Sequence, residues 1–303
     1  MGSGHSHQTA TGQHRKRLVA VLSITLTVMV AEVIGGLVAG SLALLADAGH
    51  MLTDAAAVGL ALLATAFASR PATPERTFGY QRSEILAAVV NALALFGVAA
   101  YVLVEAVKRF LSPPDVSSGL MLAVAVLGLI ANIASLLVLQ RGQSESLNLR
   151  GAYLEVQGDL LGSAAVIAAA VVIWATGFTR ADAIASAVIG MLILPRTWRL
   201  LREAIEVLLE STPKNINLAH VRDHMLAVPG VSDVHDLHAW TITSGIPVLS
   251  AHIVVDDSTL EDKGGGRVLD RLYDCLKGHF DVDHCTFQLE PMGHSDHEFS
   301  HHP

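Results

Sequence analysis

The sequence predicts an all-α bundle of six transmembrane helices followed by a small α+β domain. Of the 303 residues, 51% are hydrophobic and only 16% are charged, whereas a soluble domain usually carries about 25% charged residues. The long apolar runs all lie in the first two thirds of the chain. The last third has the composition of an ordinary soluble protein. We therefore expect two domains, the first with lipid as its solvent.

Six segments are long and apolar enough to cross a bilayer as helices, which takes about 20 residues. They occupy residues 18–38, 42–68, 85–111, 120–139, 152–176 and 183–201. Glycine and proline mark short connections between them, such as Gly40–Ser41 and Pro113–Pro114. With the N-terminus inside, the inner side holds eleven Lys and Arg residues and the outer side three. Because basic residues concentrate on the cytoplasmic side, we expect both termini to be cytoplasmic.

The remaining chain divides into a soluble domain and two polar tails. We expect a polar N-terminal tail at 1–17, the transmembrane domain at 18–204, a cytoplasmic domain at 205–291 and a His-rich C-terminal tail at 292–303. The cytoplasmic domain reads as helix 218–228, strands 231–243 and 248–255, helix 268–280 and strand 285–289. This order predicts helices on one face of a sheet.

The charge and the cysteines exclude some classes of partner and site. The net charge is −8 and there is no dense basic patch, so no nucleic-acid partner is expected. Cys275 and Cys285 do not form a CxxC pair, and we expect two reduced thiols.

Two pairs of ionisable residues in the predicted membrane helices indicate a metal site. His50 and Asp54 are four residues apart in the second helix, and Glu155 and Asp159 are four apart in the fifth. Residues at this spacing share one helix face. If the two faces meet, one imidazole and three carboxylates surround one point, which suits zinc. Asp47 lies on the face of His50, so it is expected either to bond the imidazole N–H or to line the ion path.

Several motifs in order resemble the cation diffusion facilitator family, in the branch of bacterial cobalt-zinc-cadmium resistance efflux proteins. The resemblance is carried by SLALLADAGHMLTD at 41–54, RTFGYQRSEIL at 76–86, YLEV and GDLLGS within 153–163, and VHDLHAW at 234–240. It covers residues 18–291.

This resemblance implies a homodimer in the cell inner membrane, each protomer having six helices and a cytoplasmic ferredoxin-like domain. It implies export of a divalent metal, with zinc first and cobalt or cadmium as alternatives, coupled to inward movement of protons. The family's transport site maps onto His50, Asp54, Glu155 and Asp159. Many members carry His or Asp where this chain has Glu155. A carboxylate there hardens the set of ligands, which leaves cobalt, cadmium, iron and manganese open beside zinc.

Histidines in the soluble domain predict a second metal site, with zinc as a regulatory ion. By resemblance to the family, its ligands are His235, His252 and residues of the last strand, for which His284 and Glu290 are the candidates. His238 is three residues from His235, so an extended strand is expected to turn it to the opposite face as a packing residue. Histidines of the two tails are expected either to collect zinc weakly or to have no fixed role.

Two other classes of function are weighed against the secondary antiporter. One is an intramembrane metalloenzyme that uses the same ligands, and the other is a membrane-anchored metal-sensing protein. No HExxH motif lies in a predicted span, and the soluble domain carries no nucleophile arrangement. The sequence therefore predicts a transporter and not an enzyme.

Overall fold

The computed structural model describes residues 7–140, 147–243, 245–261, 264–280 and 284–294. The chain divides into two units, which are described separately below. The first comprises residues 1–62 and 88–201, and the second comprises residues 63–87 and 202–303. Residues 295–303 of the predicted C-terminal tail lie outside the described residues, as does Ser244 between the first two predicted strands.

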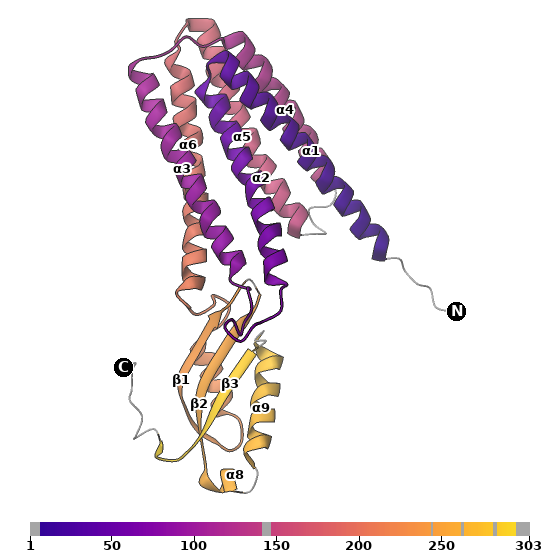
Figure 1. Cartoon of the computed structure of the whole chain (residues 1–303), viewed down its shortest axis with the longest axis vertical. Coiled ribbons are helices and arrows are strands. Elements are labelled where there is room, and N and C mark those ends of the chain that lie inside the picture. The colour runs from indigo at the N-terminus through magenta and orange to yellow at the C-terminus, as the bar shows by residue number, and fades with distance from the viewer. Residues whose placement is uncertain (1–6, 141–146, 244, 262–263, 281–283, 295–303) are drawn as a thin grey trace, which may run out of the picture. The chain divides into compact units, whose positions relative to one another are not determined.

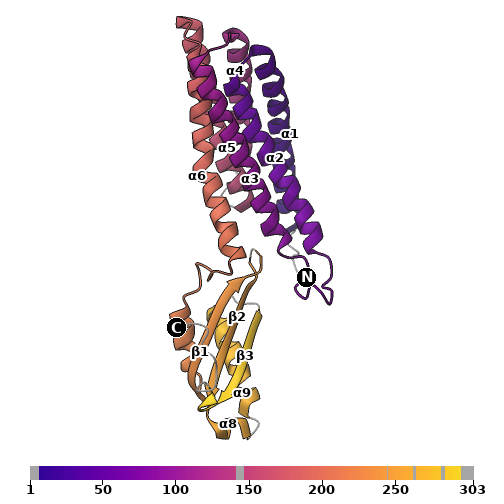
Figure 2. The ribbon, with the colours of Figure 1, turned by 60° about the vertical axis from the view of Figure 1, so that its left-hand side comes forward.

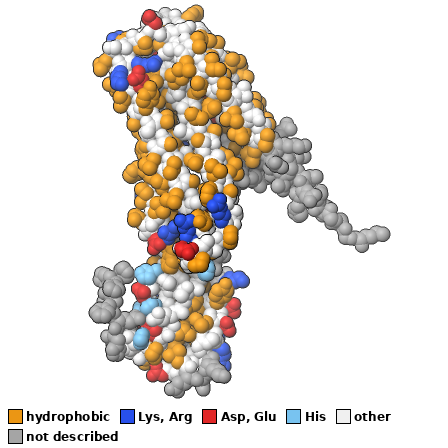
Figure 3. Space-filling view, viewed as in Figure 1, with side chains coloured by type: hydrophobic (Ala, Val, Ile, Leu, Met, Phe, Trp, Pro, Cys, Tyr) orange, Lys and Arg blue, Asp and Glu red, His pale blue; other side chains and the backbone are white. Residues whose placement is uncertain are grey.

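Six helices in the described residues are long and apolar enough to span a membrane, and they lie side by side in Figures 1 and 2. They are α1 (His7–Ala39), α2 (Leu42–Ala68), α3 (Ser83–Leu111), α4 (Ser118–Gln140), α5 (Leu147–Thr176) and α6 (Arg180–Leu208). Hydrophobic side chains cover the visible face of these helices in Figure 3, as lipid contact requires. The predicted fold class is confirmed, and the protein is a multi-pass membrane protein.

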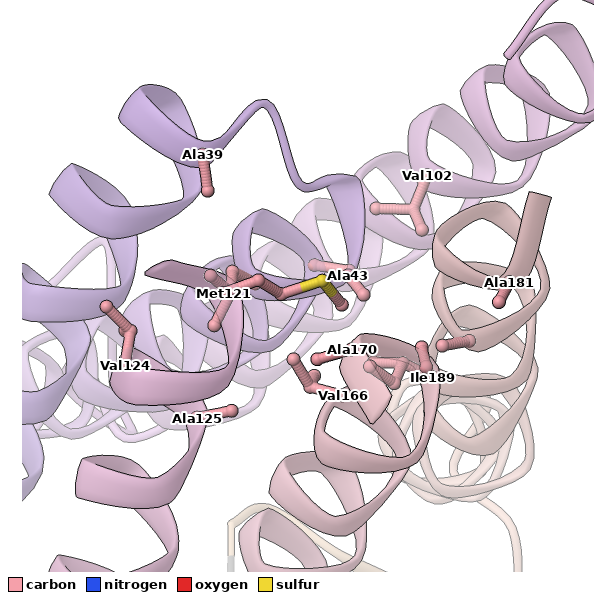
Figure 4. Packing of buried hydrophobic residues seen from close by; sticks show 14 of the residues in the cluster. Ala39, Ala43, Val102, Met121, Val124, Ala125, Val166, Ala170, Ala181 and Ile189 are labelled. Atoms are coloured by element: carbon pink, nitrogen blue, oxygen red, sulfur yellow. The ribbon is translucent and has the colours of Figure 1, made fainter. Parts of the chain in front are cut away.

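Small side chains form much of the core between these helices. Ala43 of α2, Ala99 of α3, Met121 of α4 and Ala170 of α5 are fully buried in one hydrophobic cluster, part of which Figure 4 shows from close by. Small residues let helix backbones approach closely. Close van der Waals contact matters in a bilayer, because the hydrophobic effect does not drive helices together there. This packing fixes α2 and α5, the helices that carry both predicted pairs of ligands.

A buried carboxylate from α6 caps the start of α2. Asp182 accepts hydrogen bonds from the Ser41 hydroxyl at 2.6 Å and from the backbone N–H groups of Leu42 at 2.8 Å and Ala43 at 3.2 Å. These N–H groups have no partner within the helix, so a carboxylate from elsewhere satisfies them and also favours the positive end of the helix dipole. We call this set of four residues the Asp182 clamp. It ties α2 to α6 at the end of the bundle where α1 turns into α2.

The C-terminal domain contains three strands and three helices among its described residues. The elements are α7 (Leu218–Leu226), β1 (Val231–Thr241), β2 (Pro247–Val255), α8 (Asp257–Glu261), α9 (Gly264–His279) and β3 (His284–Pro291). The sheet order is β1-β2-β3, with β1 and β2 antiparallel and β2 and β3 parallel. The predicted order of long elements is confirmed; the short α8 was not predicted. Figure 2 shows the sheet with α9 behind it.

The two faces of the sheet have different roles. Leu249, Ala251 and Ile253 of β2 are buried in one core with side chains of α7 and α9. His252 lies between two of these residues, and alternation along a strand turns it to the other face. Its register partner on β1 is His235. The sheet therefore holds its histidines on the face opposite the helices.

Candidate metal centres

Three of the four predicted transport ligands converge in the membrane bundle. His50 and Asp54 of α2 and Asp159 of α5 offer ligand atoms that all lie within 4.8 Å of one another. Nε2 of His50 is 3.4 Å from Oδ2 of Asp54. Only 3% of Asp159 is exposed. One imidazole and two carboxylates at this spacing suit a divalent transition metal.

Several polar atoms at this triad have no hydrogen-bond partner among the described residues. They include Nδ1 of His50, Oδ2 of Asp54 and Oδ1 of Asp159. Buried polar atoms are normally paired, so unpaired ones in a cluster indicate a ligand that the cluster binds. Because Nδ1 of His50 is unpaired, the hydrogen bond that Asp47 was expected to offer this imidazole is not formed. The other expectation for Asp47, a place on the ion path, stays a prediction, and Asp47 is buried in α2.

The fourth predicted ligand, Glu155, lies beside the triad but pairs with a different group. Its Oε1 is 2.8 Å from Nη2 of Arg196 in α6. Glu155 is also close enough to Asp54 for their carboxylates to interact. Arg196 is one of the eleven inner basic residues counted from the sequence, and its place at this site was not predicted. Its signal was an arginine that directly follows the apolar run 191–195 of a predicted membrane helix.

A second cluster lies on the open face of the sheet in the C-terminal domain. His235 of β1, His252 of β2 and Glu290 of β3 bring their ligand atoms within 4.8 Å of one another. Oε2 of Glu290 is 3.0 Å from Nε2 of His235, and its Oε1 is 2.8 Å from Nδ1 of His252. Only 1% of Glu290 is exposed, and Gln288 donates to it at 2.9 Å. The adjacent strands thus position two imidazoles and one oriented carboxylate as a candidate metal site.

The structure does not bring His284 into this cluster. His284 begins β3 opposite Val248, while Glu290 lies opposite Val254 near the other end of the strand. Six residues of strand separate the two by about 20 Å. The ring of His284 meets the ring of Phe78 edge-on, at 6.0 Å between centroids.

Asp236 was missed by the sequence reasoning and lies at the rim of the cluster. Its Oδ2 is 3.7 Å from Nε2 of His252, and its Oδ1 is 2.9 Å from Nε2 of His238. The backbone of Asp236 has a φ of 48°, and the register of β1 shifts between His235 and His238. This bulge breaks the strict alternation on which the expectation for His238 rested. His238 is an exposed partner of Asp236 and not a packing residue.

Two family models match the chain. One, described as the cation efflux transmembrane domain, matches residues 18–209. The other, described as the cation efflux protein, cytoplasmic domain, matches residues 213–292.

Similar proteins align with nearly the whole chain. The metal cation efflux system protein CzcD of Cupriavidus metallidurans is 50% identical over 290 residues, 96% of this chain and 90% of that protein. The zinc transporter ZitB of Escherichia coli is 42% identical over 296 residues, 96% of this chain and 93% of that protein. A Bacillus velezensis protein named cadmium, cobalt and zinc/H(+)-K(+) antiporter is 39% identical over 294 residues, with coverage of 96% and 93%.

One solved structure, the metal-bound C-terminal domain of the CzcD transporter, is 40% identical and covers 25% of this chain and 99% of that chain. With a TM-score of 0.23, the likeness adds nothing to the assignment of the fold.

Proposed function

Because the chain belongs to the cation efflux family, we propose that it exports a divalent transition metal from the cytoplasm, with zinc as the first substrate and cobalt and cadmium as further ones. Similar proteins named for metal cation efflux and zinc transport support this proposal. It is a transporter, and no covalent chemistry is required of its residues.

The observation that carries the proposal is the triad of His50, Asp54 and Asp159 in two membrane-spanning helices, with Asp159 buried and the other two partly buried. Ionised carboxylates in a bilayer cost several kcal/mol each unless a cation compensates them. A divalent ion compensates two at once, and the imidazole adds a ligand that favours zinc over magnesium or calcium. Glu155 is the fourth ligand in this proposal, once it is released from Arg196.

Proton exchange follows from the chemistry of the same ligands. A metal binds deprotonated imidazole and carboxylate, so metal and protons compete for the triad. Metal that loads from the cytoplasm displaces protons, and protons from the other side return to the ligands and expel the metal. The Bacillus velezensis relative is named an antiporter of this kind, which supports the exchange.

The remaining parts of the proposal concern assembly, orientation and regulation. Both termini lie in the cytoplasm and the helices span the cell inner membrane, as the excess of inner basic residues favours. Two copies form a homodimer, which the match to a cytoplasmic domain model labelled ZT_dimer supports. Zinc at His235, His252 and Glu290 is a regulatory ion of the C-terminal domain.

Zinc flux into proteoliposomes with a pH gradient tests the export function. Wild-type protein is expected to move zinc along with a counterflow of protons, and Asp54→Asn and Asp159→Asn are expected to abolish both. Asp115→Asn changes an exposed acid between α3 and α4, so it is the matched control. Unchanged zinc flux in both triad variants would reject the proposal.

The same assay separates the other two classes of function. A metal-sensing protein binds zinc but moves none across the membrane, and a metalloenzyme also moves none. Zinc binding without flux in the wild-type protein would therefore favour one of them.

A further inference from the structure

Two buried carboxylates lie beyond the triad, on the side of the turn between α1 and α2. Glu32 of α1 is 1% exposed and Asp47 of α2 is 2% exposed. Together with Asp159 of α5, each keeps one carboxylate oxygen without a hydrogen-bond partner among the described residues. These atoms are Oε2 of Glu32, Oδ2 of Asp47 and Oδ1 of Asp159. Buried and unpaired oxygens from three helices call for a ligand that compensates them.

Two glycines make the space into which these carboxylates point. A methyl group on Gly162 of α5 would collide with Oδ1 of Asp47. A methyl group on Gly128 of α4 would lie 2.8 Å from Oε1 of Glu32 and 3.5 Å from the Ser163 hydroxyl. Because Gly128 and Gly162 have no side chains, the carboxylates of Glu32 and Asp47 reach the backbones of α4 and α5. We call the space around these carboxylates the cradle.

The polar groups of α4 and α5 complete the lining of this cradle. Nδ2 of Asn132 donates to the Ser163 hydroxyl at 3.3 Å. That hydroxyl is itself hydrogen-bonded to Asp47. A chain of polar groups thus runs from α4 across α5 to α2, and it holds the hydroxyl oxygen of Ser163 beside the carboxylates.

The carboxylates of the cradle lack a basic partner. Among the described residues, no Lys or Arg forms an ion pair with Glu32, Asp47 or Asp159 within 4.0 Å. The arginine of the neighbouring ion pair, Arg196, is bound to Glu155. Removing carboxylates from water without such a partner is costly, and more so for three together. One divalent ion compensates two of the charges and gives the unpaired oxygens a common ligand.

We propose that Glu32, Asp47 and Asp159, with the Ser163 hydroxyl, form a second divalent-cation position next to the His50–Asp54–Asp159 triad. This position rests on the proposed export function, because Asp159 belongs to both sites and passes the ion from one to the other. Its donors are all oxygen atoms. It therefore prefers harder ions and binds zinc more weakly than the triad does, since the triad includes an imidazole.

The position of the cradle along the helices places it after the triad on a path from the cytoplasm to the outside. Asp47 precedes His50 by three residues, and Ser163 follows Asp159 by four, so both lie about one helical turn nearer the turn between α1 and α2. In the proposed orientation this is the outer side. A weaker site between the triad and the outside lets the ion leave in two steps, as conduction through successive sites requires.

Manganese binding by the purified full-length protein tests the second position. Mn²⁺ is a hard ion that suits an all-oxygen site, and electron paramagnetic resonance counts its bound and free forms. Wild-type protein is expected to bind one more Mn²⁺ per chain than Glu32→Gln or Asp47→Asn. The control Asp115→Asn is expected to match the wild type. In all of these proteins zinc is still expected to bind at the triad, because the triad residues are intact.

Gly128→Ala provides the same test without removing a charge. Its methyl group crowds Glu32 and Ser163, so this variant is also expected to lose one Mn²⁺ per chain while the triad keeps its zinc. If Glu32→Gln does not fold, Gly128→Ala decides the question. Equal Mn²⁺ counts in wild type and variants would overturn the proposal, as would a loss of triad zinc affinity that parallels the loss of Mn²⁺, because that result indicates a structural role.

The outcome is distinguishable from failure of the export function. Normal zinc flux in the wild type with equal Mn²⁺ counts rejects the second position alone. If the wild type binds one more Mn²⁺ than the variants but moves no zinc, the export function is rejected and the second cation position is retained.

Discussion

Nη2 of Arg196 in α6 lies 2.8 Å from Oε1 of Glu155 in α5, one turn along that helix from Asp159. The guanidinium is therefore paired with the carboxylate that is expected to be the fourth ligand of the metal. Metal that binds Glu155 has to displace a charge that the protein itself supplies. This relationship makes α6 a part of the site, although it contributes no ligand to the triad.

The first prediction concerns this ion pair. Arg196→Gln removes a competitor for Glu155 and a positive charge near the metal, so zinc is expected to bind about threefold to tenfold more tightly, or roughly 0.7 to 1.4 kcal/mol. Calorimetric titration of the purified protein with zinc measures this change. Arg199→Gln removes an exposed charge from the same helix and is expected to leave the affinity unchanged. Weaker or unchanged binding in Arg196→Gln would contradict a competition between Arg196 and zinc for Glu155.

The second prediction concerns the Asp182 clamp. Asp182→Asn places an amide where a carboxylate accepts from the Leu42 N–H, and it leaves a buried donor unpaired. The expected loss of stability is about 2 kcal/mol. A lower Tm of thermal unfolding in detergent, by several degrees, is the measurement. Asp115→Asn serves as the control, and an equal Tm in both variants would contradict the capping role.

The third prediction separates two sets of ligands in the C-terminal domain. Glu290→Gln is expected to remove one bound zinc per chain, because Glu290 contacts both His235 and His252. His284→Ala is expected to keep that zinc, since His284 lies at the other end of β3. Metal analysis of the purified chain counts the ion. Loss of zinc in His284→Ala and retention in Glu290→Gln would favour a different cluster.

Zinc is also expected to protect the domain that holds this cluster. A ligand at about 100 times its Kd stabilises the state that binds it by about 2.7 kcal/mol. Hydrogen exchange of β1 and β2 is therefore expected to slow with zinc in the wild type and to be unaffected by zinc in Glu290→Gln. Addition of EDTA to the wild type is expected to restore the fast exchange.

The fourth prediction concerns a thiol of β3. Burial raises the pKa of Cys285, because desolvation disfavours the thiolate. The folded chain therefore holds this proton to higher pH than the unfolded chain does, and the associated stability is lost as the pH rises through the thiol range. In a Cys275→Ser background, alkylation by iodoacetamide is expected to be slow at pH 8 and to keep rising above pH 9. If Cys285 of the folded chain were alkylated at pH 8 as fast as in the SDS-unfolded chain, the raised pKa of its thiol would be contradicted.

Much of the fold follows from periodicity and length alone. Apolar runs of about 20 residues have one stable solution in lipid, so the six spans were predictable. The i, i+4 spacing places His50 with Asp54 on one face of a helix, whatever surrounds it. The meeting of that face with Asp159 depends on the packing of α2 against α5, and in the structure the ligand atoms of His50, Asp54 and Asp159 lie within 4.8 Å of one another.

Other features of the two sites depend on how helices and strands pack together, which the spacing of residues in the sequence does not reveal. The pairing of Arg196 with Glu155 requires the rotation of α6 about its axis, which a single sequence does not encode in any local pattern. The choice between His284 and Glu290 depends on strand register, which brings Gln288 and Glu290 beside His252 and Val254. The role of Asp236 depends on a bulge, and a bulge reverses the alternation that strand reasoning assumes.

The Asp182 clamp also holds α2 in place at its N-terminal end only, so a tilt of the helix moves its other end most. At 1.5 Å per residue, His50 lies about 12 Å along the axis from Leu42, and the far end of α2 lies about 40 Å away. A tilt of about 10° about the pinned end shifts His50 by about 2 Å and the far end by about 7 Å. The smaller shift equals the length of a zinc–ligand bond, about 2 Å. A tilt of this size would therefore be large enough to break coordination by His50, and it would displace the far end of the helix by more than the length of a zinc–ligand bond.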